Sequence, residues 1–219
     1  MRRGLFLAVL LLAGCGGGND HTPPPRRAGS RPVTLDLPTS RETRACFADL
    51  SRRDVRFTPM ADRDYGGGCR VIGAVQLLDI GIPVTNLKAM RCELADSFTA
   101  WTRHAVVPAA YQILGSELVR VESMGSYACR NVIGAPAAAG KLSGHAIANA
   151  VDVSGFVLQD GRRITVAEGW RSPDPRIRAF FQAIHNSACK RFGTVLSPDY
   201  NAAHYNHLHL EDDHKRFCH

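Results

Sequence analysis

This 219-residue chain has seven cysteines, and the six that follow Cys15 limit the ways in which it can fold. They are Cys46, Cys69, Cys92, Cys129, Cys189 and Cys218. An even number of cysteines in an exported protein indicates disulfides, here three. Sequence alone leaves fifteen pairings open, and we expect the one that joins neighbours along the chain, 46–69, 92–129 and 189–218. No two cysteines have the spacing C-x-x-C, which argues against a cysteine zinc site.

The first residues indicate that the chain is exported. Arg2 and Arg3 precede an apolar run over 5–13, which is far shorter than the roughly 20 residues of a membrane-spanning helix. The run ends in Leu-Ala-Gly before Cys15, and this pattern resembles the bacterial lipobox, in which the cysteine is lipidated. An ordinary secretory signal followed by a chance cysteine is the alternative. We therefore expect a lipoprotein signal peptide over residues 1–14 and a lipid anchor on Cys15.

Residues 15–40 are expected to form a tether between this anchor and the folded part. Gly, Pro and Arg dominate the segment and large apolar side chains are scarce, so it cannot bury a core. Residues 41–219 suit a single domain. We expect a monomeric periplasmic lipoprotein of a Gram-negative bacterium. In enteric bacteria an aspartate directly after the lipidated cysteine is associated with retention in the inner membrane. This chain has Gly16 there, which favours the outer membrane.

The charge of the chain bears on its partners. The formal net charge is +7, and removal of Arg2 and Arg3 with the signal peptide leaves +5. This mild excess contains no block of lysine and arginine of the kind that nucleic-acid-binding proteins carry. We expect no nucleic-acid partner, and an anionic cell-wall polymer is the more natural neighbour.

Helical and extended patterns alternate irregularly along the rest of the chain. The apolar residues of 94–105 recur at helical spacing, and Ser172-Pro173 predicts the start of a helix that ends near Gly193. Strands are expected over 117–123, 149–158, 164–170, 194–196 and 207–210. This order predicts a compact α+β domain, with a central, largely antiparallel sheet flanked by helices and stapled by disulfides.

A carboxylate interrupts one of the expected strands. Asp152 lies between Val151 and Val153, seven residues after His145. Burying a carboxylate in an apolar strand costs free energy unless it is paired or binds a metal. A structural aspartate paired with an arginine is the alternative to a metal ligand.

Three histidines crowd residues 204–210, which read HYNHLHL. Side chains alternate along a strand, so His207 and His209 project from one face, and His204 can approach from the side. Two histidines and one aspartate would leave a fourth position on Zn²⁺ for water, as in catalytic zinc sites. The extra imidazoles could then accept a proton. A solvated histidine run in a tail is the alternative.

These motifs resemble known families. S-x-H-x(6)-D at 143–152, followed by H-x-x-H-x-H at 204–209, resembles the LAS metallopeptidases, which include lysostaphin-type enzymes, D-Ala-D-Ala metallopeptidases and the hedgehog zinc domain. The histidine spacing is nearest to the penicillin-insensitive murein endopeptidases. From Cys46 onward the chain also resembles the bacterial extensin-like C-terminal domain family. That resemblance rests on WTRHAVVPAA, YACRN, LSGHAIANAVDVSGF, ACKRFGTVLSPDYNAAHYNHLHLED and the closing cysteine.

The resemblance implies one Zn²⁺ per chain. The ligands that it implies are His145, Asp152 and His209. His207 and His204 fall on non-ligand active-site histidines, and either could be the base. Arg130 falls on an arginine that binds a substrate carboxylate or steadies an oxyanion, a role that suits a guanidinium. A surface arginine beside a disulfide is the alternative for Arg130.

One position departs from the family pattern. The family usually has glycine three residues after the first ligand, where this chain has Ala148. If the backbone there needs a positive φ, alanine strains it by about 1 kcal/mol or more. All of the implied ligands are present, so we expect the metal site to persist.

The sequence therefore predicts a zinc-dependent peptidase that acts on peptidoglycan peptide stems or crosslinks. The alternative is a non-catalytic, zinc-stabilised module that binds cell-wall peptide or a protein partner. The two non-ligand histidines favour the enzyme, because a purely structural site needs neither. A structural envelope protein without metal would leave Asp152 and the histidine cluster unexplained.

Overall fold

The computed structural model describes residues 38–219. The expected signal peptide, the lipidation site Cys15 and most of the expected tether lie outside these residues. Helix α1 (Ser40–Arg52) comes first, and a capping box begins it: Thr39 accepts from the Glu42 N–H while the Glu42 side chain accepts from the Thr39 N–H. None of the helices between residues 38 and 219 has the length and apolar character that crossing a membrane would require.

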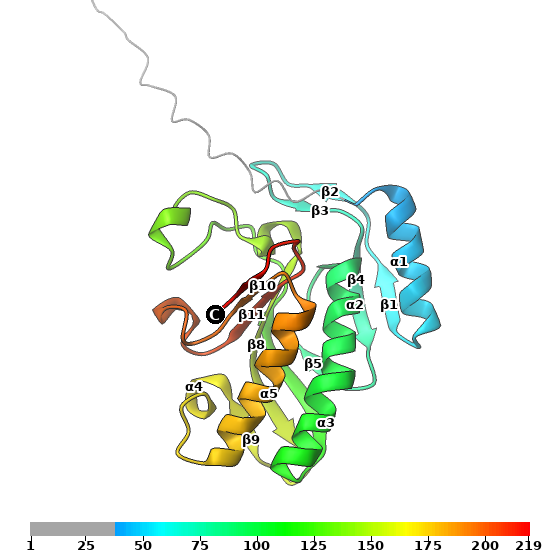
Figure 1. Cartoon of the computed structure of the whole chain (residues 1–219). Helices are drawn as coiled ribbons and strands as arrows, with labels where there is room; N and C mark the ends of the chain where they lie inside the picture. The colour runs from blue at the N-terminus through cyan, green and yellow to red at the C-terminus, as the bar shows by residue number, and fades with distance from the viewer. Residues whose placement is uncertain (1–37) are drawn as a thin grey trace, which may run out of the picture.

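Seven strands form the main sheet (Figure 1). They are β5 (Val84–Thr85), β7 (Leu118–Gly125), β8 (Ala150–Leu158), β9 (Arg163–Thr165), β10 (Thr194–Leu196), β11 (Leu208–Glu211) and β12 (Phe217–Cys218). The order is β12-β10-β11-β8-β7-β5, and β9 pairs with β8. The β5–β7 and β10–β12 pairs are parallel and the others antiparallel. The predicted α+β class is confirmed, with a mixed but mostly antiparallel sheet.

Helices cover one face of this sheet, where Figure 1 shows α5 beside the run from α2 to α3. The elements are α2 (Cys92–Trp101), η1 (Thr102–Val106), α3 (Val107–Ala109), η2 (Ala110–Leu114) and α5 (Pro175–Arg191). The fully buried Trp101 donates its indole N–H to the carbonyl oxygen of Ile184 at 2.9 Å, which ties α2 to α5. Phe180 of α5 packs edge-on against Phe156 of β8. The core therefore lies between the helices and one face of the sheet.

A smaller unit packs beside the main sheet. Strands β1 (Arg56–Pro59), β4 (Ala74–Asp79) and β6 (Met90–Arg91) form an antiparallel sheet, next to α1 in Figure 1. Strands β2 (Arg63–Asp64) and β3 (Arg70–Val71) form a separate hairpin.

The disulfide connectivity differs from the expected one. The structure joins Cys46 to Cys92, Cys69 to Cys129 and Cys189 to Cys218. The sequential prediction is wrong for the first two bonds and confirmed for the third. Cys46 lies on the face of α1 that packs against the start of α2, and Cys69 lies in the hairpin that packs against the segment before residue 130. These are long-range contacts that cysteine spacing does not reveal.

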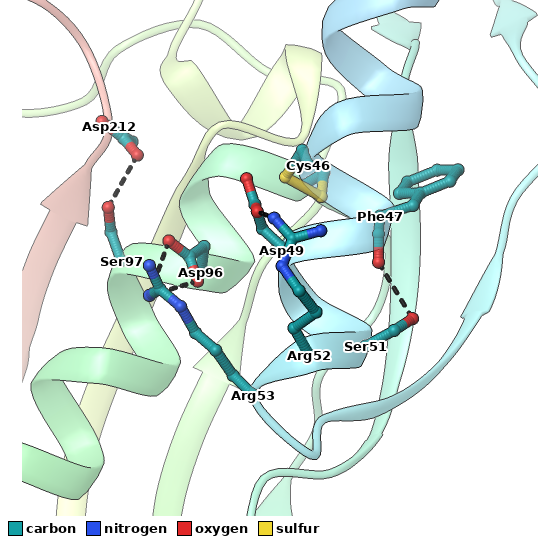
Figure 2. The surroundings of a disulfide bond; sticks show 10 residues. Cys46, Phe47, Asp49, Ser51, Arg52, Arg53, Asp96, Ser97 and Asp212 are labelled. Carbon is teal, nitrogen blue, oxygen red and sulfur yellow. Dashed lines mark hydrogen bonds and ion pairs between the residues drawn. A yellow bond between two sulfur atoms is a disulfide. The ribbon is translucent and has the colours of Figure 1, made fainter.

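Polar contacts support the Cys46 disulfide (Figure 2). Arg53, just after α1, forms an ion pair with Asp96 of α2 through two contacts of 2.8 and 3.0 Å. Ser97 of α2 donates to a carboxylate oxygen of Asp212 at 2.9 Å, just beyond β11. Helix α2 is therefore held to α1 on one side and to the end of β11 on the other.

Two local predictions need correction. The expected strand 164–170 ends at Thr165, and α4 (Val166–Gly169) follows, because the Thr165 hydroxyl accepts from the Glu168 N–H and caps a helix. Helix α5 does not begin at Ser172-Pro173. Asp174 caps it, accepting from the Arg176 N–H at 2.8 Å, and proline 175 occupies its first turn.

Candidate metal centre

The pairing of β8 with β11 places Asp152 beside His209. The two residues are direct partners in an antiparallel register, so their side chains share one face of the sheet. Their strand neighbours Val151, Val153 and Leu208 are fully buried in the core beneath the helices. Alternation therefore turns Asp152 and His209 to the face opposite the helices.

His145 reaches the same point from η4 (Gly144–Ile147). The Ser143 hydroxyl caps this turn and accepts from the His145 N–H at 3.4 Å. The His145 Nε2 lies 3.0 Å from Asp152 Oδ2 and 3.2 Å from His209 Nδ1. His209 Nδ1 lies 2.7 Å from Asp152 Oδ1. All three side chains are buried. The structure brings the three expected ligands together.

The donor atoms fit a tetrahedral zinc ion. Zinc bonds of about 2.0–2.2 Å place neighbouring donors of a tetrahedron about 3.3–3.5 Å apart. Here the two ring nitrogens lie 3.2 Å apart, and each faces a different oxygen of Asp152, at 3.0 Å from His145 and 2.7 Å from His209, so outward shifts of a few tenths of an ångström would admit the ion. Two imidazoles and one carboxylate are ligand types that zinc prefers, and they leave a fourth position open.

Ala148 links η4 to β8 in the left-handed conformation, with φ 55° and ψ 28°. Its N–H donates to the His145 carbonyl at 3.1 Å, and its own carbonyl accepts from the Arg91 N–H at 2.8 Å. The turn therefore has its backbone hydrogen bonds satisfied although the residue is not glycine. The conditional prediction of strain at Ala148 applies, because the backbone does adopt a positive φ there.

Two further imidazoles border the ligands. His207 Nδ1 donates to the amide oxygen of Asn206 at 2.9 Å, and His204, the last residue of η5 (Ala202–His204), donates in the same way to Asn201 at 2.7 Å. An amide oxygen only accepts, so the Nδ1 atoms carry the protons and each Nε2 keeps a lone pair. His207 Nε2 lies 3.5 Å from Asp152 Oδ1. Both rings are therefore set up as proton acceptors.

Burial and hydrogen bonding pull the pKa values of the site in opposite directions. Burial alone would raise the pKa of Asp152, but hydrogen bonds from two imidazoles hold it well below its ordinary value. Burial alone would lower the pKa of His209, but hydrogen bonds to Asp152 and Glu211 raise it to about 10. Burial lowers the pKa of His207, and burial with repulsion from nearby histidines lowers that of His204 to about 4. Asp152 is therefore anionic and His204 neutral at pH 7.

Arg130 lies at the edge of the centre. Its guanidinium is 3.8 Å from Asp152 Oδ2, its side chain is partly exposed, and the preceding residue forms the Cys69–Cys129 disulfide. The centre opens into a cavity of about 580 Å³, a size typical of ligand-binding pockets. Lys141 and Lys215 also line it. Exposed apolar side chains at its rim are Met124, Ile133, Tyr205 and Phe217.

Glu211 is a member of the site that sequence reasoning missed. Its Oε1 lies 2.8 Å from His209 Nε2, the ring nitrogen that faces away from Asp152. The signal was available, because residues two apart on a strand share a face and Glu211 follows His209 by two. Glu211 begins the acidic run 211–213, and the sequence prediction gave none of these three carboxylates a role.

Another group of side chains of the kinds that bind metals lies away from this centre. It consists of His185, Cys189 and Cys218. The two sulfur atoms are joined in a disulfide, so neither is available as a thiolate ligand. This grouping is therefore not a candidate metal centre in the oxidised protein.

Comparison with known proteins identifies the family. The family described as the extensin-like protein C-terminus matches residues 44–219. The chain belongs to this family. The matched region of this extensin-like domain contains every residue of the candidate metal centre and all three disulfides. No curated protein and no solved structure matches the chain.

Proposed function

We propose that this extensin-like domain is a zinc-dependent peptidase that cleaves peptide stems or crosslinks of peptidoglycan in the bacterial envelope. The observation that carries the proposal is the convergence of His145, Asp152 and His209, with two further histidines beside them whose Nε2 atoms can accept a proton. The resemblance of these positions to the LAS metallopeptidase pattern supports the same reaction class.

The proposed site would hold one zinc ion through the three converging side chains. When bound, zinc supplies Lewis acidity that polarises a carbonyl group and acidifies water. The negative charge of Asp152 matches what such a cation needs from its ligands, and His209, whose pKa is raised to about 10, would give up a proton when the ion binds.

We assign the base to His207. Its Nε2 carries a lone pair and lies 3.5 Å from Asp152, so it can remove a proton from a water that attacks the scissile carbonyl carbon. As the carbon–nitrogen bond breaks, the protonated ring returns that proton to the leaving amine, and a carboxylic acid and an amine result. His204, whose ring centroid is 5.1 Å from that of His207, is the second candidate for the base.

The cavity favours an acidic peptide. Arg130 and Lys141 line it with cationic groups, and Lys215, paired with Asp213, adds a third. Peptidoglycan stems carry several free carboxylates, which a guanidinium binds in fixed geometry. In the proposal, Arg130 therefore binds a substrate carboxylate near the reacting bond.

The test is digestion of purified sacculi followed by muropeptide analysis. The zinc-loaded protein should release new muropeptides, and His207→Ala should lower the rate by about 10²-fold or more while zinc remains bound. His204→Ala examines the second base candidate. His104→Ala is the matched control, because His104 is an exposed histidine on η1. A zinc-loaded wild type that leaves the muropeptides unchanged would support the non-catalytic binding module instead.

The proposal includes a lipid anchor at Cys15 on the periplasmic side of a Gram-negative envelope. Cys15→Ser should move the protein from the membrane fraction to the soluble fraction, while a signal sequence with an ordinary cleavage site would leave its distribution unchanged.

A further inference from the structure

Glu211 is a carboxylate that the sheet buries next to the metal centre. It occupies the last position of β11, opposite Ala150 of β8 and Thr194 of β10. Only 12% of its side chain is exposed. Burying a carboxylate there costs free energy unless specific partners compensate it, so its contacts indicate its role.

Both contacts of Glu211 Oε1 go to segments that carry proposed metal ligands. It accepts from His209 Nε2 at 2.8 Å and from the backbone N–H of Gly144 at 3.2 Å. His209 belongs to β11, whereas Gly144 immediately precedes His145. One oxygen atom thus connects His209 on β11 to the turn that carries His145.

The absence of a side chain at residue 144 makes this arrangement possible. A Cβ atom there would lie 2.6 Å from Glu211 Cδ and Oε1, and 3.0 Å from Oε2. Such distances are far below van der Waals contact, so any larger residue would push the carboxylate away. The backbone of Gly144 is therefore fitted to Glu211.

We propose that Glu211 is a positioning residue for the metal centre. Its hydrogen bond to Nε2 sets the ring of His209 so that Nδ1 faces Asp152, and its bond to Gly144 fixes the turn that presents His145. A carboxylate behind a metal-binding imidazole fixes the tautomer and orientation of the ring and raises its basicity. This inference rests on the metal-binding part of the proposed function and not on the identity of the substrate.

The experiment measures zinc affinity by competition with a chelator, and the visible spectrum of the cobalt-substituted protein. Glu211→Ala should weaken zinc binding by about 10- to 100-fold and alter the cobalt spectrum. Glu211→Gln, which has the same shape, should restore part of the affinity. Glu122→Ala is the matched control, because Glu122 is a strand carboxylate with similar exposure (16%) whose ion pairs are with Arg120 and Arg163. It should retain wild-type affinity and spectrum.

Gly144→Ala completes the test as a double-variant cycle. Alone it should weaken zinc binding, because the methyl group displaces Glu211. In the Glu211→Ala background it should add little, because there is no carboxylate left to displace. Wild-type affinity and spectrum in folded Glu211→Ala and Glu211→Gln would overturn the inference. A wild type that binds no zinc would instead overturn the proposed function.

Discussion

Removal of the Cys69–Cys129 disulfide should weaken the fold and substrate binding together. The bond joins residues 60 apart in sequence, for which loop entropy gives a stabilisation of about 4 kcal/mol at 25 °C. The Cys46–Cys92 bond spans 46 residues and gives about 4 kcal/mol by the same relation. Replacing either pair by serine should therefore lower the free energy of unfolding by a similar amount.

The two disulfides differ in what they hold. Cys129 directly precedes Arg130, the residue proposed to bind a substrate carboxylate, whereas Cys46–Cys92 joins α1 to α2. The Cys69→Ser/Cys129→Ser variant should therefore raise KM by about tenfold, which corresponds to one charge-assisted hydrogen bond of about 1.4 kcal/mol. Cys46→Ser/Cys92→Ser should leave KM unchanged.

The assay combines denaturant unfolding with kinetics on purified muropeptides, at a temperature where both variants are folded. We expect the two variants to lose similar amounts of stability, and we expect KM to rise only in Cys69→Ser/Cys129→Ser. An equal KM in the two variants would refute the argument that this disulfide positions Arg130. A difference of more than about 2 kcal/mol in their stabilities would refute the loop-entropy reasoning.

Three further predictions follow from single residues. His145→Ala should abolish the binding of about one zinc per chain, measured by elemental analysis, and full metal retention would contradict the ligand assignment. Ala148→Gly should change the free energy of unfolding by less than about 1 kcal/mol. The substitution relieves left-handed strain of about 1–2 kcal/mol, but glycine makes the unfolded chain more flexible and removes a buried methyl group. A larger change in denaturant unfolding would show that these effects do not offset one another. Burial lowers the pKa of His185, so below about pH 6.5 the unfolded chain binds a proton that the folded chain does not, and stability falls as the pH drops. His185→Phe should remove the contribution of this residue to the acid limb of the unfolding profile, while His204 and His207, whose pKa values are also lowered, keep theirs. An unchanged limb would exclude His185 as one of its sources.

Local patterns predicted well the two strands that carry Asp152 and His209. Asp152 lies between two valines and His209 between two leucines, so each projects from the strand face that points away from the core. The pairing of β8 with β11 brings these two side chains together. The family pattern alone predicted that His145 joins these two side chains, because its position depends on a turn rather than on a periodic element. The left-handed conformation of Ala148 follows from that turn.

Long-range contacts account for what the sequence did not reveal. Two disulfides join elements whose packing no cysteine spacing encodes. Glu211 became interpretable only when its carboxylate was seen between His209 and Gly144. The start of α4 is a different case, because its capping threonine and glutamate are visible in the sequence and were outweighed by the extended pattern around them.

Location of zinc by anomalous diffraction at its absorption edge tests the central claim most directly. We expect one peak per chain, about 2.0–2.2 Å from His145 Nε2, an oxygen of Asp152 and His209 Nδ1. A peak bound by other side chains, or crystals of zinc-treated protein with no peak between these three donors, would contradict the account.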